Sequence, residues 1–243
     1  MSDGLTARQT QILKALIDEY IETAEAVGSE NLDKKYNLGV SPATIRNEMV
    51  ALTKAGYLRQ THTSAGRIPS PKAMKFYIDQ LMEEKRMSLA DEIKAKEDVW
   101  DSRGSLDSLL AGVTKVLAER TQNIALAATD EGKVWHSGYA SIFSNPEFAD
   151  IDACTGLFSF LEEAERINEL FFGSANQDSP FEVFFGEELN WPEMAPVGVV
   201  TTHFKAGGRK GALGVIGPIR LSYSTVIPTL RYFKSMIEEV AGA

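Results

Sequence analysis

The stretch SPATIRNEM, residues 41–49, decides the predicted fold of the first third of the chain. Serine followed by proline is the strongest helix-start signal in the sequence, because Ser41 can cap the first backbone amides and Pro42 suits the first helical position. Apolar residues then recur on one side at helical spacing: they are Ile45, Met49 and Leu52. The pattern predicts a helix that packs this side inward and ends near Lys54.

The opposite side of this helix carries small and hydrogen-bonding residues together with cations. Its members are Ala43, Thr44, Arg46, Asn47, Val50 and Lys54. Short side chains let a helix enter the DNA major groove, and arginine and asparagine can pair with guanine and adenine edges. Arg46 and Asn47 are therefore the leading candidates for base or phosphate contacts. Ser41 and Thr44 are predicted to anchor the DNA backbone at the helix N-terminus, and Lys54 supplies a further cation for phosphate.

Two shorter signals upstream predict the helices that support this one. Thr6 can cap an amphipathic helix whose apolar residues fall between positions 12 and 21 at helical spacing. Ser29 can cap a short second helix over 30–36. Asparagine and glycine in the turn 37–40 tolerate the positive φ that ends a helix.

A short hairpin is predicted directly after the third helix. Residues 57–60 are strand-like, 61–67 form a turn-rich loop and 67–69 return as a second strand. A hairpin in this position is a wing, which can touch phosphates or the minor groove beside the main contact. The residues predicted at its tip are His62, Thr63, Ser64 and Arg67. His62 is not expected to bind metal, because the other two histidines are far away in the sequence.

Positive charge is concentrated in one stretch of an acidic chain whose formal net charge is −9. Residues 34–75 hold eight Lys or Arg and one acid, Glu48, whereas residues 1–33 hold two Lys or Arg and seven acids. Such a basic island suits a DNA-contacting face and keeps the rest of the molecule off the duplex. A charge run alone is more often a solvated surface, so the prediction of DNA binding depends mainly on the residues of the helix face.

The composition is that of a soluble globular protein, with 44% hydrophobic and 24% charged residues. The apolar runs are too short to span a bilayer, and no signal peptide is recognisable. A single cysteine, Cys154, excludes an internal disulfide framework and fits a reducing compartment. These features predict a cytoplasmic location without a membrane partner.

The rest of the chain is predicted to form a linker helix over 79–104 and an α+β domain over 105–243. Five segments look like strands, within residues 123–130, 132–143, 181–186, 197–205 and 211–219. Helical spacing is predicted for 106–120, 153–171 and 226–240. Strands interrupted by helices in this way indicate a mixed, sensor-like domain.

No catalytic, cofactor or metal site is predicted. The glycines between 208 and 217 match neither a phosphate-binding loop nor a dinucleotide-binding motif. The histidines are scattered, no Cys/His cluster exists, and pairs such as Glu187-Glu188 are more often solvent-facing than general acids and bases. The chain is therefore not expected to be an enzyme.

Long matching stretches make the chain similar to a known family. Residues 5–81, including SPATIRNEM, the GYL strand start and HTSAGRIPS, resemble the N-terminal winged helix-turn-helix of the heat-inducible transcription repressor HrcA family. The C-terminal part resembles the GAF-like domain of the same family through Gly214, Gly217, Pro218, Arg220 and Tyr223. It departs from the family pattern at Ile219, Leu221 and Ser222.

The resemblance implies a DNA-binding domain over 1–78 and a GAF-like regulatory and dimerisation domain over 105–243. Family members usually carry an inserted segment that is implicated in dimerisation, and the short run from Phe160 to Phe181 leaves little room for it. The resemblance further implies a homodimer that represses heat-shock and chaperone genes by binding double-stranded DNA at an inverted-repeat operator called CIRCE. It implies the GroEL chaperonin as a partner.

Two other functions are compatible with parts of the pattern. The GAF-like domain could sense a small molecule, although the sequence reveals no convergent polar pocket. The chain could also be a protein-interaction scaffold that does not use its helix-turn-helix on nucleic acid. The basic stretch and the Arg46-Asn47 face argue against the scaffold.

Overall fold

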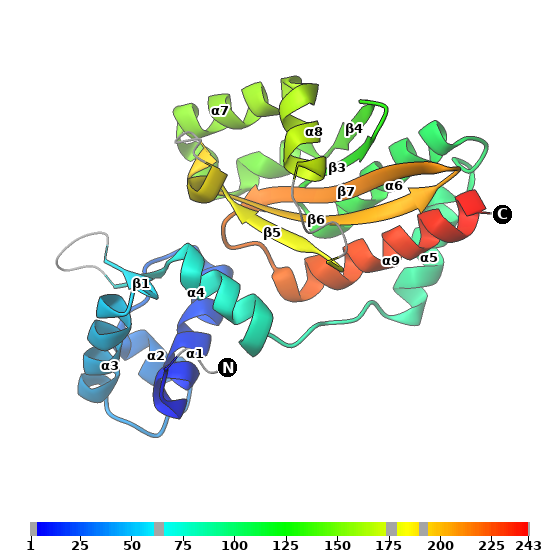
Figure 1. Ribbon diagram of the computed structural model, residues 1–243. Coiled ribbons are helices and arrows are strands. Elements are labelled where there is room, and N and C mark those ends of the chain that lie inside the picture. The colour runs from blue at the N-terminus through cyan, green and yellow to red at the C-terminus, as the bar shows by residue number, and fades with distance from the viewer. Residues whose placement is uncertain (1–3, 61–65, 174–178, 190–193, 243) are drawn as a thin grey trace. The chain divides into compact units, whose positions relative to one another are not determined.

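The computed structural model describes residues 4–60, 66–173, 179–189 and 194–242 of the 243-residue chain. The chain divides into two compact units, Met1–Glu83 and Glu84–Ala243. Figure 1 colours the first unit from blue to cyan and the second from green to red.

Three helices and a small hairpin form most of the first unit (Figure 1). The helices are α1 (Ala7–Thr23), α2 (Ser29–Lys35) and α3 (Pro42–Lys54), and the antiparallel strands are β1 (Leu58–Arg59) and β2 (Ile68–Pro69). Helix α4 (Pro71–Phe76) and a π-helical turn (Tyr77–Leu81) complete the unit. This order confirms the predicted winged helix-turn-helix.

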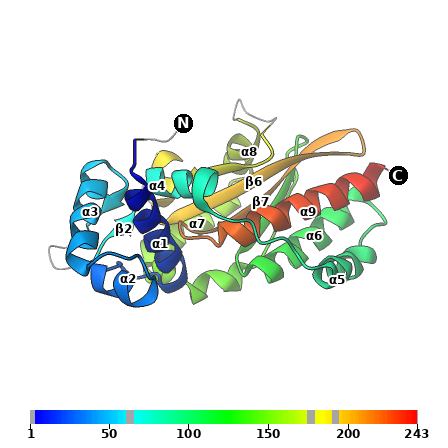
Figure 2. The same ribbon diagram turned by 90° about the horizontal axis from the view of Figure 1, so that it is seen from below.

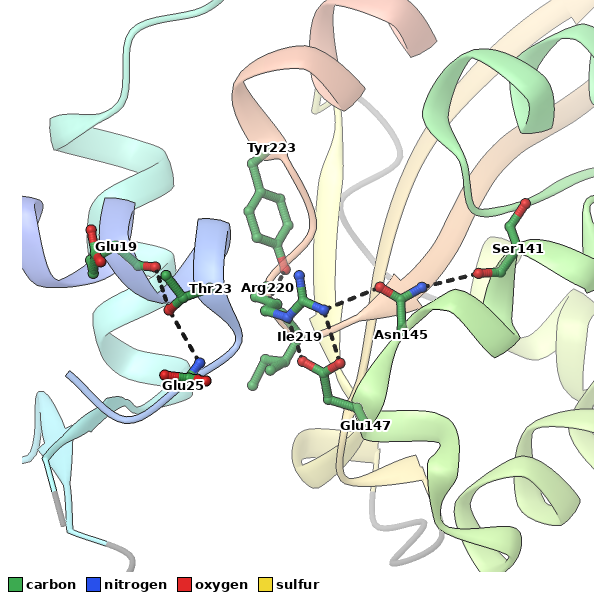
Figure 3. A network of polar contacts seen from close by, with 9 residues as sticks. All are labelled: Glu19, Thr23, Glu25, Ser141, Asn145, Glu147, Ile219, Arg220 and Tyr223. Atoms are coloured by element: carbon green, nitrogen blue, oxygen red, sulfur yellow. Dashed lines mark hydrogen bonds and ion pairs between the residues drawn. The ribbon is translucent and has the colours of Figure 1, made fainter.

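Side chains fix both ends of α1. At its start, Thr6 Oγ1 accepts a hydrogen bond from the Gln9 amide (3.2 Å) and the Gln9 side chain accepts one from the Thr6 amide (3.0 Å). At its end, the Thr23 hydroxyl donates to the Glu19 carbonyl (2.9 Å) and accepts from the Glu25 amide (3.2 Å), as Figure 3 shows. The helix therefore has defined ends on which α2 and α3 can be positioned.

Helix α2 begins one residue earlier than the sequence predicted. Gly28, not Ser29, is the N-cap and makes no side-chain capping bond, while Ser29 is buried in the first turn. The reason lies just before the helix, where the backbone amides of Val27 and Arg67 each donate to the carbonyl of the other at 2.9 Å. This bridge holds the chain extended up to Gly28, so the helix starts immediately behind it.

The second unit is built around a five-stranded antiparallel sheet in the order β4-β3-β7-β6-β5. The strands are β3 (Ile124–Thr129), β4 (Val134–Ser137), β5 (Glu182–Phe185), β6 (Val197–Ala206) and β7 (Arg209–Pro218). The helices are α5 (Leu89–Trp100), α6 (Leu106–Thr121), α7 (Ile151–Glu162), α8 (Ala164–Phe172) and α9 (Tyr223–Gly242), with 3-10 turns at Tyr139–Ser144, Pro146–Ala149 and Gly186–Leu189. This mixture confirms the predicted α+β class.

Helices cover both faces of the sheet. Figures 1 and 2 show α7 and α8 over one face and α6 and α9 over the other. All six residues of β3 are buried, as expected for an inner strand covered on both sides. On the α7–α8 side the core contains Leu126, Phe160, Phe171, Val199 and Ile216.

The segment predicted as one linker helix, 79–104, is not a single helix. Residues 82–88 have no regular secondary structure, and α5 starts only at Leu89. Ala95 and Val99 on α5 are 0% and 2% exposed, and α5 packs against α6. Because burying these two side chains requires a neighbouring surface, α5 belongs to the second unit instead of connecting the two.

Three other element boundaries differ from the prediction. The helical stretch 153–171 is divided into α7 and α8 because Glu163 has a non-helical backbone. The strand expected within 132–143 is limited to β4, because Gly138 takes a left-handed conformation (φ 94°) that ends it. The last helix begins at Tyr223, earlier than the predicted 226.

An ion pair with little exposure anchors the turn between β7 and α9 (Figure 3). Arg220 Nε and Nη2 donate to the two carboxylate oxygens of Glu147 at 2.6 and 3.1 Å, and Nη2 also reaches Asn145 Oδ1 at 3.2 Å. The Arg220 and Glu147 side chains are 13% and 14% exposed. In the same turn, the Tyr223 hydroxyl donates to the Ile219 carbonyl at 2.6 Å. These bonds fix the start of α9 against the segment before α7.

Candidate nucleic-acid interface

Helix α3 starts with the cap that the sequence predicted. Ser41 Oγ accepts a hydrogen bond from the Thr44 amide at 3.3 Å, and the two hydroxyl oxygens of these residues lie 3.0 Å apart. Pro42 occupies the first helical position. The contact orients both hydroxyl groups at the positive end of a 13-residue helix, where a phosphate is favoured.

The two sides of α3 are separated as predicted. Ile45, Met49 and Leu52 are at most 1% exposed and form the inner side. On the other side Ala43, Arg46, Asn47, Val50 and Lys54 are exposed, and Thr44 is half-buried. Within the part of the chain that the structure describes, Arg46, Asn47 and Lys54 make no side-chain hydrogen bond or ion pair. Their polar groups are therefore available for an external partner.

Glu48 has a role that the sequence did not reveal. Its carboxylate accepts a hydrogen bond from Gln9 Nε2 at 3.1 Å and lies 3.6 Å from Arg8 Nη1, so it ties α3 to the first turn of α1. The one acid of the basic stretch is thus directed away from the exposed side of α3. Gln9, which also closes the capping box of α1, is the only local signal that could have pointed to this contact.

The base of the hairpin contacts α3 and the segment just before α2. Arg67 is half-buried, and its Nε donates to Thr53 Oγ1 at 2.9 Å. Gly66 is required beside it, since a Cβ at this position would lie 2.5 Å from the carbonyl of Val27. Arg67 therefore lies at the base of the wing and not at its tip as predicted, because its backbone is paired with Val27. The other predicted wing residues, His62, Thr63 and Ser64, lie outside the described residues.

Several cations of the basic stretch serve the fold. Lys35 Nζ lies 2.7 Å from carboxylate oxygens of both Glu19 and Glu22, and these bonds raise its pKa. Burial, together with a hydrogen bond to Glu19, raises the pKa of Tyr36 to about 12. Lys72 stacks over the Tyr57 ring at 4.2 Å and donates to the end of α3. The sequence count of eight cations thus overstates the charge that faces outward.

Comparison with known families covers nearly the whole chain. A family described as the winged helix-turn-helix transcription repressor, HrcA DNA-binding, matches residues 4–80. The HrcA protein C-terminal domain matches residues 49–227. The chain belongs to the HrcA family. Its first unit is the family's DNA-binding domain, and this family consists of transcription repressors, not enzymes.

Individual relatives carry the same description. The chain is 26% identical over 336 residues to the heat-inducible transcription repressor HrcA of Carboxydothermus hydrogenoformans, with 97% of this chain and 98% of the relative covered. It is 28% identical over 337 residues to that of Alkaliphilus metalliredigens, with 97% and 98% covered. Because both alignments are longer than the 243 residues of this chain, they contain internal gaps on its side.

A solved crystal structure of a hypothetical protein shares the fold of this HrcA family member. Its TM-score is 0.76 at 16% identity, with 97% of this chain and 98% of the other covered. In the described ranges no three His, Cys, Asp or Glu side chains gather to hold a metal ion. Among these same residues, no helix combines the length and apolar character needed to cross a membrane.

Proposed function

We propose that this HrcA family member represses heat-shock and chaperone genes by binding, as a homodimer, an inverted-repeat DNA operator of the CIRCE type. The exposed side of α3 carries the proposal, since Arg46 and Asn47 lie on it without side-chain partners among the described residues, and Glu48 faces α1 instead. A repressor of this kind acts in the cytoplasm, where its operator lies.

In the proposed complex the first turns of α3 enter the major groove. Arg46 and Asn47 contact base edges, because their side chains can form paired hydrogen bonds with guanine and adenine. Ser41 and Thr44 hold a phosphate at the helix N-terminus, and Lys54 reaches the phosphate backbone further along. The wing adds contacts from His62, Thr63, Ser64 and Arg67, with Arg67 also orienting the wing through Thr53.

The proposed homodimer follows from the symmetry of an inverted repeat. Two winged helices about one helical turn apart, or a multiple of it, place two copies of α3 in successive major grooves. The second unit is proposed to be GAF-like and to provide the dimer contact without most of the family's inserted segment. Its antiparallel sheet covered by helices on both faces and the gaps in the alignments support this part.

Heat response requires only that the dimer be marginally stable. When the dimer partly unfolds, its two winged helices are no longer held together. The gain in affinity from binding both half-sites of the operator at once then disappears. A chaperonin of the GroEL type is proposed to restore the folded repressor. If operator affinity vanished well below the first unfolding transition, a discrete switch would replace this mechanism.

A gel-shift titration tests the proposal with a CIRCE-type inverted repeat and a scrambled duplex at two salt concentrations. Specific binding is expected to survive the higher salt better than binding to the scrambled duplex. Arg46→Ala and Asn47→Ala should each cost about 1–3 kcal/mol of operator affinity per lost base contact. Lys94→Ala on α5 removes an exposed cation of the second unit and should leave affinity unchanged. Equal operator affinity of the unaltered chain and the three variants would contradict the proposal.

A further inference from the structure

A cavity of about 360 Å³ lies at the turn end of the β6–β7 hairpin, beside α9. Figures 1 and 2 show α9 running along β6 toward this end of the sheet. Its lining includes Lys205 of β6, Lys210 of β7 and Lys234 of α9, and Glu238 is its one acid among the described residues. We call it the lysine cavity.

The strand register forces two of these lysines together. Lys205 and Lys210 are directly opposite each other in the β6–β7 pair, so their side chains leave the same face of the sheet. Like charges in this arrangement are destabilising. The turn between them is Gly207-Gly208, with φ angles of +59° and +78°, a tight two-residue turn that fixes the register. The pair therefore cannot separate by a slip of the strands.

Neighbouring cations have carboxylate partners that the cavity lysines lack. Arg209 Nε lies 3.0 Å from Glu131, and Lys133 Nζ lies 2.7 Å from Asp107. In the described part of the chain, no ion pair joins the side chain of Lys205, Lys210 or Lys234 to a carboxylate. Glu238 lines the cavity with these lysines, and its Oε1 accepts the backbone amide of Lys205 at 3.1 Å.

The wall of the cavity also contains a polar atom without a partner. His203 Nε2 lies 2.6 Å from the Phe171 carbonyl oxygen, so this nitrogen carries the hydrogen. Nδ1 of the same ring is buried and bonds to no described group. Because Nε2 carries the hydrogen, Nδ1 is an acceptor, and only a ligand group that brings a hydrogen, such as the P–OH of a protonated phosphate, would satisfy it.

From these features we propose that the lysine cavity binds a small, multiply charged oxyanion of the phosphate or polyphosphate class. The cavity is lined by three lysines, and the ammonium group of a lysine is a compact point charge that suits phosphate oxygens. The volume lies within the ~300–1,000 Å³ of small-molecule sites and the surface is concave. A duplex needs a protruding surface such as α3, so the cavity favours a small ligand over nucleic acid. The proposal does not depend on operator recognition.

Calorimetric titration of the full chain with inorganic tripolyphosphate, in buffer free of magnesium, tests the site. One ligand is expected to bind per chain and to raise the unfolding temperature of the second unit. Lys210→Gln and Lys234→Gln should each weaken binding about tenfold, as for the loss of a charged hydrogen bond. Lys115→Gln on α6 removes an exposed lysine outside the cavity and should bind like the unaltered chain.

The unfolding temperature of a lysine variant measured without ligand provides a second test. Lys210→Gln should unfold at a higher temperature than the unaltered chain without ligand, because it removes the cross-strand repulsion. This rise also demonstrates that the variant folds. Equal affinity of Lys210→Gln and the unaltered chain for tripolyphosphate would overturn the proposal. The proposal would also be overturned if the chain bound a polyglutamate peptide or a scrambled DNA duplex but did not bind tripolyphosphate.

Discussion

The exposed side of α3 and the lysine cavity are two cationic surfaces in an otherwise acidic chain, and they differ in shape. Arg46 and Lys54 are exposed on a helix, whereas Lys205, Lys210 and Lys234 line a hollow. In neither place does a described carboxylate form an ion pair with these cations. The charge therefore selects an anionic partner in both cases, and the shape of the backbone decides between a duplex groove and a small molecule.

The two surfaces also differ in what supports them. Helix α3 is held by a small core and by single polar contacts, such as that of Glu48 with Gln9 and that of Arg67 with Thr53. The lysine cavity is built on strands that pair over ten residues. Changes in one unit should therefore damage one surface and leave the other intact.

The largest effect is expected from Leu52→Ala. Leu52 is 0% exposed beneath α3, and truncating a buried leucine costs about 2–5 kcal/mol because a cavity is left. Operator binding should be lost, while tripolyphosphate binding in the second unit should persist. Calorimetric unfolding and both binding assays measure this. Val50→Ala, on the exposed side of the same helix, is the control for stability. Loss of both activities would show that the units do not fold separately.

Arg220→Met should destabilise the second unit instead of the first. It leaves Glu147 without its partner in a position that is only 14% exposed, which costs about 3 kcal/mol for a pair of this burial. The unfolding transition of the second unit should move to lower temperature, and that of the first unit should not. Adding Glu147→Leu should recover much of the loss, because no charge is then buried alone. A double variant as unstable as the single one would contradict this account.

Local signals explain why α3 could be predicted closely. The Ser41-Pro42 cap and the spacing of Ile45, Met49 and Leu52 are written within a dozen residues, and the structure has both. The contact of Glu48 with α1 joins residues 39 positions apart, which no local pattern contains. For the same reason Arg67 was expected at the wing tip, although its pairing with Val27 places it at the base.

Tertiary packing explains the misses in the second unit. The charged composition of 79–104 suggested a continuous helix, but burial of Ala95 and Val99 joins α5 to the second unit. The lysine cavity needs β6, β7 and α9 to meet, so the sequence alone did not reveal it. The Gly207-Gly208 turn is the one local signal from which opposition of Lys205 and Lys210 could have been deduced.

Substitution of Glu48 tests whether its contacts with α1 orient α3 for operator recognition or only stabilise the fold. Glu48→Ala removes the contacts with Arg8 and Gln9, and about 1 kcal/mol or less of stability is expected to be lost because the carboxylate is partly exposed. Operator specificity should fall, while binding to a scrambled duplex should rise with the loss of an acid. The ratio of the two affinities measures this. Glu48→Gln keeps the side chain's length and should retain more of the ratio. An unchanged ratio in Glu48→Ala would show that the link to α1 does not orient α3.

The smallest expected change in stability comes from a comparison of two cations on α9. Arg231 forms an ion pair with Glu84, and Lys234 has no carboxylate partner among the described residues. Arg231 donates to both carboxylate oxygens of Glu84 at 2.8 and 3.0 Å, and these bonds lower the pKa of Glu84 below its ordinary value of 4.5. Because the pKa of Glu84 is lower in the folded state than in the unfolded chain, the pair stabilises the fold at pH values above the unfolded pKa. This contribution is lost as the pH falls from that value through the lowered pKa.

The expected cost of Glu84→Gln at pH 7 is below about 1 kcal/mol, since the Glu84 and Arg231 side chains are 32% and 46% exposed. Unfolding measured between pH 7 and pH 3 should show this difference shrinking below pH 4.5. Lys234→Gln, one turn further along α9, removes no ion pair to a described residue and should cause no loss of stability at pH 7. A Glu84→Gln difference that grew on acidification would reverse the assigned direction of the pKa shift. Loss of stability in Lys234→Gln would show that its charge serves the fold, and the contrast between paired and ligand-binding cations would fail.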